Sequence, residues 1–265
     1  MKPILALTGL TILVCGLVPA QERVVVPARN TTHPRQVYVK TLNHSITVKT
    51  YAGPDVIVEV GAAESRRNRR PPADAAGMKR LDVPRGLEIT EEENVIHINP
   101  SVLVSGPITI SVPVDTSLNL QTHNGSLNVD GVHGEIVAHA FNGHIELTNV
   151  SGTVVADAFN GPIHVSMDRV DQGKPLSFST FNSSIDVTLP ADVKATAKFK
   201  TDRGDIYSDF EVTMSTGSPV LQPDNSGQGK YRVRFDRGMQ GTINGGGVEM
   251  NFHTFNGSIF IRKKK

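Results

Sequence analysis

The feature that most constrains this chain is a short internal repeat. Residues 136–147 read IVAHAFNGHIEL, and residues 154–165, which begin 18 positions later, read VVADAFNGPIHV. Apolar and polar positions alternate on both sides of a shared Phe-Asn-Gly. Alternation with a period of two predicts short β-strands, and Asn-Gly predicts a tight corner between them. Further copies begin at Leu118, Leu176 and Met250, and weaker ones at Val37 and Ala197, which makes seven.

Two architectures fit this pattern. Each Asn-Gly could close an antiparallel hairpin, giving a meander or sandwich in which Ala140 pairs with Ile145. Alternatively, each copy forms one coil of a parallel β-solenoid, with coils of about 18–22 residues stacked on one another. Stacked coils place like residues on like, which explains why the same types recur from copy to copy. We therefore expect an all-β, β-helix-like solenoid, with the hairpin meander or sandwich as the alternative.

A solenoid aligns equivalent positions in columns. We expect the Asn column to be a ladder of stacked amides that satisfies corner backbone groups, or else a polar stripe that binds a glycan. We expect the Phe column to close one corner, although exposed stacked rings would suit sugar faces or a protein partner. The two columns contain Asn124, Asn142, Asn160, Asn182 and Asn256, and Phe141, Phe159, Phe181 and Phe255. Strict alternation also predicts a core containing Ile145, Leu147, Ile163, Val165, Ile185 and Val187 with Ala138 and Ala156.

One outward column brings Glu146, His164 and Asp186 to adjacent coils, between Asn128 before them and then Tyr207 and Phe260 after them. Carboxylates beside an imidazole could bind a cation or act as acid and base. Polar residues on an exposed β-face need no such role, so we treat the trio only as a possible ligand surface.

No signature of a nucleophile, a zinc site or a phosphate-binding loop occurs, and we expect neither catalysis, nor a metal, nor a cofactor. Glycines recur every nine residues from Gly125 to Gly161, but the recurring Asp of a calcium-binding roll is missing after them.

The ends of the chain carry different signals. Residues 1–20 combine Lys2, an apolar run and small residues before Gln21, which predicts a secretory signal peptide. The remaining residues, 21–265, read as one domain with an exposed insertion at about 61–80, which contains Arg66–Arg70, and a loop at about 215–230. The only cysteine, Cys15, lies in the signal peptide, so no disulfide is expected.

The net charge limits the classes of partner that the chain can bind. Cleavage after Ala20 would remove Lys2 from the 27 basic residues and leave 26 basic and 26 acidic residues. A neutral chain argues against nucleic acid as the main partner. We expect no transmembrane segment after cleavage.

The repeated Thr/Ala-Phe-Asn-Gly-x-Ile-x-Val motif, together with residues 185–190 and 245–259, resembles the bacterial putative-adhesin family, an exported domain of unknown function. That family is related to the head domains of autotransporter adhesins. The resemblance covers roughly residues 35–262. It implies a β-helix-like fold and an envelope or surface location, and it supplies no catalytic residues.

Three function classes follow. The first is an exported, non-catalytic binding or scaffold protein that contacts a protein or glycan of the cell envelope, in the periplasm, on the surface or outside the cell. The second is an envelope sensing or signalling accessory. The third is a β-helix enzyme acting on polysaccharide, which would need clustered carboxylates in a groove.

Overall fold

The structure, a computed structural model, describes residues 22–28, 33–61, 86–101, 106–215 and 239–265. The predicted signal peptide, the insertion with Arg66–Arg70 and the loop that follows Ser215 lie outside the described residues. Within those ranges every regular element is a β-strand, which confirms the all-β class. Over the same part of the chain, no helix is long and apolar enough to cross a membrane.

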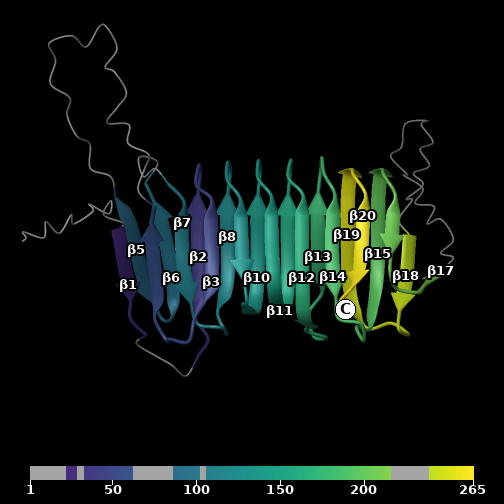
Figure 1. The fold of residues 1–265 in the computed structure, drawn as a ribbon, viewed down its shortest axis with the longest axis horizontal. Helices are drawn as coiled ribbons and strands as arrows, with labels where there is room; N and C mark the ends of the chain where they lie inside the picture. Colours follow the sequence, from purple (N-terminus) through teal and green to yellow (C-terminus); the bar gives the residue numbers. More distant parts are fainter. Residues whose placement is uncertain (1–21, 29–32, 62–85, 102–105, 216–238) are drawn as a thin grey trace, which may run out of the picture.

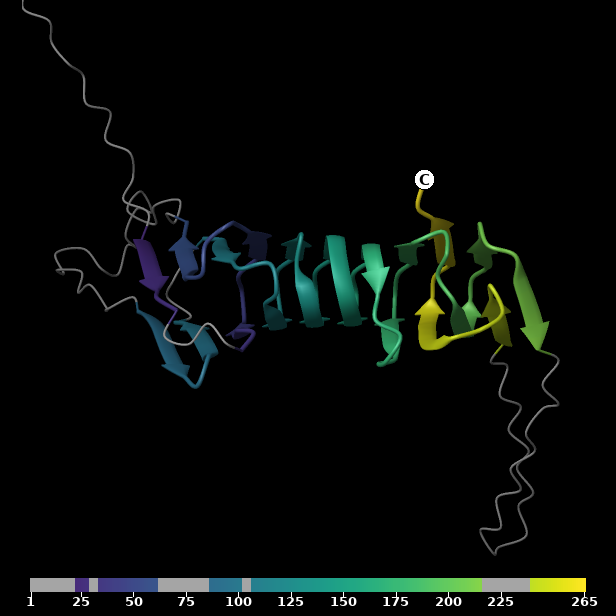
Figure 2. The same cartoon turned by 90° about the horizontal axis from the view of Figure 1, so that it is seen from below.

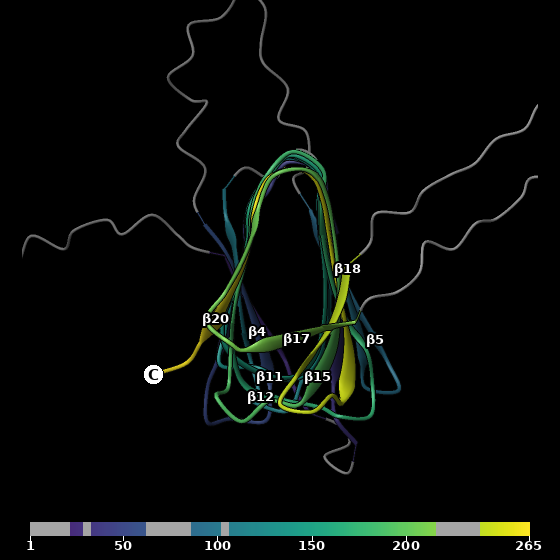
Figure 3. The same cartoon turned by 90° about the vertical axis from the view of Figure 1, so that its right-hand side faces the viewer.

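The strands form two walls along an elongated stack (Figure 1; Figure 2), and the walls converge at a narrow apex when the stack is viewed along its axis (Figure 3). In stacking order, the first wall contains β6 (Val95–Pro100), β2 (Gln36–Thr41), β8 (Ser117–Thr122), β10 (His133–Ala140), the second half of β11 (Ile145–Ala158), β13 (Leu176–Thr180), β19 (Val248–Asn256) and β15 (Ala195–Arg203). The second wall contains β7 (Ile108–Val112), β3 (Ile46–Thr50), β9 (Leu127–Asp130), the first half of β11, β12 (Ile163–Val170), β14 (Ile185–Leu189), β20 (Ile259–Lys263) and β16 (Ile206–Ser208).

Strand pairing is parallel within the repeat. Ala140 pairs with Thr122 and Ala158, and Ile145 pairs with Leu127 and Ile163. Ala140 and Ile145 are not partners, so the hairpin alternative is wrong at this corner. The predicted parallel solenoid therefore accounts for only part of the sheet, because strands at the two ends of the stack pair antiparallel. These end strands are β1 (Glu22–Val26), β4 (Val56–Val60), β5 (Leu87–Glu92), β17 (Val212–Ser215) and β18 (Met239–Ile243). A parallel stack leaves unpaired edges on its last coils, and these strands cover the outer edges of β6, β7 and β15.

The order of the coils differs from the order of the sequence near both ends. Strands β2 and β3 lie between the β6–β7 coil and the β8–β9 coil, although they precede both in the chain. Strands β19 and β20 lie between the β13–β14 coil and the β15–β16 coil. The β6–β7 coil is an eighth one, which the repeat count missed because its sequence lacks Phe-Asn-Gly.

The core lies between the two walls and follows the predicted alternation. The six predicted core side chains from Ile145 to Val187 are each at most 3% exposed, which confirms that prediction. Ala138 and Ala156 are also buried. Further along the stack, Phe178, Phe252 and Phe199 form an internal aromatic layer, with ring centroids 5.2 and 5.4 Å apart. Bulky rings replace the alanines of the central coils, so the interior stays filled from coil to coil.

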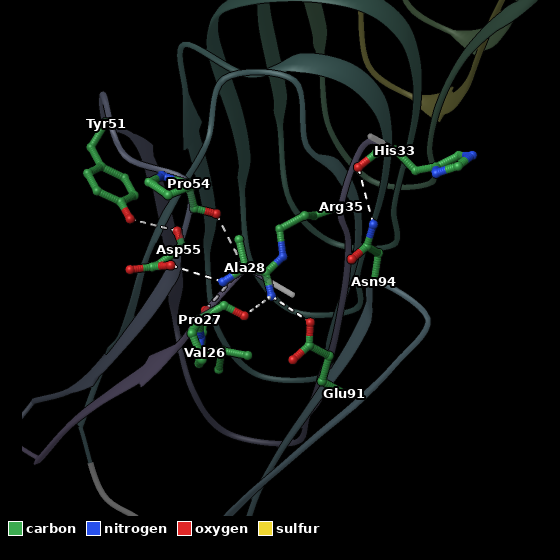
Figure 4. Close-up of polar contacts among 10 residues, drawn as sticks. All are labelled: Val26, Pro27, Ala28, His33, Arg35, Tyr51, Pro54, Asp55, Glu91 and Asn94. Atoms are coloured by element: carbon green, nitrogen blue, oxygen red, sulfur yellow. Dashed lines mark hydrogen bonds and ion pairs between the residues drawn. The ribbon is translucent and has the colours of Figure 1, made fainter. Parts of the chain in front are cut away.

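A buried ion pair between Arg35 and Glu91 joins segments at the N-terminal end of the stack (Figure 4). The Arg35 guanidinium donates to Glu91 Oε1 over 2.9 Å and to the carbonyl oxygens of Val26, Pro54 and Pro27. Arg35 therefore joins β1, the turn before β4 and the β5–β6 hairpin. A charge this deeply buried requires such partners, so the cluster serves the end of the stack rather than a ligand.

Candidate functional site

Along the apex, exposed aromatic rings stack into a continuous ribbon. The rings of His123, Phe141, Phe159, Phe181 and Phe255 follow one another with centroids 4.6–5.0 Å apart and planes within 8° of parallel. The Arg203 guanidinium lies over the last ring, 5.7 Å from the centroid of Phe255. We call this series the Phe ribbon. Phe141, Phe159 and Phe181 are each 41% exposed, so the rings sit at the surface.

The stacking decides which chemistry the Phe ribbon can offer. Phe141, Phe159 and Phe181 are each stacked between two neighbouring rings. A sugar stacks on an aromatic face, where the quadrupole is negative, whereas ring edges are apolar and slightly positive. The neighbouring rings therefore restrict the area of face that these three side chains can offer to a sugar ring.

Beside the Phe ribbon runs the Asn ladder, which contains Asn43 and the five predicted asparagines. The Nδ2 of each side chain donates to the Oδ1 of the next over 2.7–3.1 Å, always toward Asn43. Aligned amide dipoles strengthen one another. Each interior amide has a second N–H and a second lone pair, so the ladder adds a row of polar groups to the apex.

A shallow hollow of about 360 Å³ follows the Phe ribbon on the side of the first wall. Its lining comes from three rows of residues in register. The rows are Leu42, His123, Phe141 and Phe159 at the corner, Lys40, Gln121, His139 and Asp157 two residues earlier, and the buried Thr41, Thr122, Ala140 and Ala158 between them. The hollow crosses four coils, because these residues come in register from β2, β8, β10 and β11. We call it the apical groove.

The apical groove was not predicted from the sequence. Lys40, Leu42, Gln121 and His123 occupy the repeat positions of His139 and Phe141, so the register pointed to them. However, their residue types differ from copy to copy, so recurrence in the sequence does not mark them.

The predicted trio lies on the second wall. Glu146 pairs with His164, and His164 pairs with Asp186, so the three occupy adjacent coils as expected. The Arg262 Nε donates to both oxygens of Asp186, over 2.8 and 3.0 Å, and Asp186 holds the pKa of this guanidinium above its usual range. Asp186 is therefore committed to an ion pair. Among the described residues, no group of three acidic, His or Cys side chains could hold a metal ion.

The predicted order of this column is wrong at its end. The structure places Phe260 next to Asp186, and Tyr207 beyond Phe260, because the last coil of the sequence is inserted before β16. The rings of Phe260 and Tyr207 stack with centroids 5.2 Å apart, and the Arg262 guanidinium lies 5.6 Å from the Phe260 centroid.

These features define a repetitive all-β protein whose most distinctive surface is an aromatic and amide edge with a groove beside it. A family model described as Toastrack DUF4097 matches residues 92–244, more than half of the chain, and the chain belongs to this family. A solved structure described as a "putative cell adhesion protein" from Clostridium sporogenes aligns with 92% of this chain and 100% of its own, at 9% identity and a TM-score of 0.45. A comparison with curated proteins finds no match.

Proposed function

We propose that this chain is an exported, non-catalytic binding or scaffold protein of the bacterial cell envelope, and that the apex with the Phe ribbon is its contact surface. The signal-peptide pattern of residues 1–20 supports export, and membership of the Toastrack family supports a binding role. The observation that carries the proposal is the row of surface phenylalanines, because contiguous exposed apolar groups mark interaction sites.

The fold itself does not require phenylalanine at this position. Leu42 and His123 occupy it in two coils that stack as regularly as the others. Four successive phenylalanines at this position, three of them 41% exposed, therefore support a role in contact with a partner in addition to closing the corner.

Binding to envelope material tests the proposal. We expect the labelled protein to bind isolated envelopes of the source cells, and the double variant Phe159→Gln/Phe181→Gln to bind at least about tenfold more weakly, since apolar anchors dominate such contacts. The control, Glu146→Ala/His164→Ala, alters the second wall and should bind like the wild type. Circular dichroism verifies that both variants fold. Absence of wild-type binding, or equal binding by the ribbon variant, contradicts the proposal.

The proposal also states that no reaction is catalysed. Asp186 is held by Arg262, which leaves Glu146 and His164 without a second free carboxylate in their column. We expect no turnover of glycans, peptides or esters by the purified protein. If the protein turns over one of these substrates and Glu146→Gln abolishes that turnover, the proposal of a non-catalytic protein is wrong and an enzymatic function takes its place.

A further inference from the structure

We propose that the apical groove binds an extended peptide segment of a partner protein, in which an acidic and a basic side chain lie four residues apart and apolar side chains lie between them. The inference rests on the proposed function and specifies its partner. It follows from the shape of the groove, from the orientation of the rings and from the charges at its two ends.

The two outward rows that line the groove differ in polarity. Phe141 and Phe159 belong to an apolar row, while Gln121 and His139 belong to a polar row two residues earlier along each strand. An extended peptide directs successive side chains in opposite directions, so a strand with alternating apolar and polar residues matches both rows at once.

Ring orientation favours peptide over carbohydrate. Phe141 and Phe159, the two phenylalanines that line the groove, are each stacked between neighbouring rings, which restricts the face available to a sugar ring, whereas their exposed parts can contact aliphatic side chains and carbonyl oxygens. Gln121 Nε2 donates one hydrogen bond to Asn119 Oδ1, and its amide has a second N–H and a carbonyl oxygen. Those groups suit the backbone of a peptide that passes over this coil.

The charges at the two ends of the groove set the distance between the charged side chains of the ligand. Lys40 lies at one end of the groove, and Asp157 lies three coils away. Coils are separated by about 4.8 Å, so the two charges are about 14 Å apart along the stack. Four residues of extended chain cover about 13–14 Å. The Asp157 carboxylate is 56% exposed and lies 3.7 Å from His139 Nδ1, so it remains accessible to a ligand cation.

Three fluorescein-labelled peptides with blocked ends test this assignment. All carry Val at positions two and four and Ser at position three, and positions one and five are Glu and Lys, Glu and Glu, or Lys and Lys. Fluorescence anisotropy should show that the wild-type protein prefers the Glu/Lys peptide by about threefold to fivefold, the range expected of exposed ion pairs.

Two variants should then change the preference. Asp157→Lys should prefer the peptide with two Glu, and Lys40→Glu should prefer the peptide with two Lys. Both positions are surface positions on strands, so the fold should be retained, and Glu146→Lys on the second wall is the matched control that keeps the wild-type preference. Equal binding of all peptides by all variants would overturn the assignment.

Cellohexaose provides the carbohydrate arm of the test. Saturable binding of this glycan that Phe159→Gln weakens, together with no binding of the peptides, would overturn the peptide inference and leave the proposed binding function standing. If the wild-type protein binds neither envelopes nor the peptides, both the proposed function and the peptide inference are wrong.

Discussion

Asn142 Nδ2 donates a hydrogen bond to Asn124 Oδ1 over 2.8 Å, although the two residues are 18 positions apart. Asn142 Oδ1 in turn accepts from Asn160 Nδ2 over 2.7 Å. An interior member of the ladder is therefore both donor and acceptor, whereas Asn43, within the part of the chain that the structure describes, has only the accepting role.

This direction predicts unequal effects of one substitution at two positions. Asn142→Asp replaces the donor with a carboxylate oxygen facing Asn124 Oδ1, and should lower the free energy of unfolding by about 1 kcal/mol. Asn43→Asp keeps the acceptor and should cost less than half of that. Urea denaturation of both variants measures the difference. Equal losses of unfolding free energy in the two variants would contradict the assigned direction of the hydrogen bonds.

The corner glycines are needed for a steric reason. A Cβ on Gly143 would lie 1.8 Å from the carbonyl oxygen of Gly125, which belongs to the backbone and cannot rotate away. We expect Gly143→Ala to destabilise the protein by about 3 kcal/mol or more. Gly173→Ala is the control, because its nearest atom is Asp171 Oδ1 at 3.4 Å. Thermal unfolding should leave the control within a few degrees of the wild type, and a comparable loss in both variants would contradict the steric argument.

Burial predicts the cost of shortening one core side chain. Ile163 is fully buried, between Ile145 and Ile185 of the neighbouring coils. Ile163→Ala should lower the free energy of unfolding by about 2–5 kcal/mol, since it removes buried methyl groups and leaves a cavity. His164→Ala changes the adjacent, outward side chain and should cost less than about 0.5 kcal/mol. A change below about 0.5 kcal/mol for Ile163→Ala in chemical denaturation would be incompatible with its position.

One surface pair gives a pH dependence. Lys198 holds the pKa of the Glu249 carboxyl below its ordinary value of 4.5, first by a hydrogen bond and then by its charge. A carboxyl with a lowered pKa in the folded state contributes stability above the unfolded pKa and loses it as the pH falls through the folded pKa. The stability difference between wild type and Lys198→Met should therefore be present at neutral pH and disappear below the folded pKa of Glu249.

Carbon-13 NMR titration of Glu249 provides the direct measurement. In Lys198→Met the pKa of this carboxyl should rise toward 4.5. Lys200→Met changes a cation of the same strand that is not hydrogen-bonded to Glu249, and should leave the titration midpoint in place. An unchanged midpoint in Lys198→Met would rule out the pair as the cause.

The strands, the corners and the inward side chains could all be predicted from the repeat. Alternation around Ile145 and Ile163 fixes which side chains face the core, because a shift by one residue would expose all of them. The recurrence of Asn and Gly predicted a corner at which Asn142 and Asn160 share one column. Both features arise from local chemistry, which each copy of the repeat carries independently.

The order of the coils and the surface of the apex, by contrast, depend on long-range packing. All coils have similar inward and outward patterns, so no single copy specifies its neighbour, and the insertion of β2–β3 and β19–β20 depends on how distant segments close both ends of the stack. The spacing between coils likewise stacked Phe141 on Phe159 at the surface, and register brought Lys40 beside a groove that it shares with Asp157. These relationships join residues far apart in the chain, and local periodicity carries no information about them.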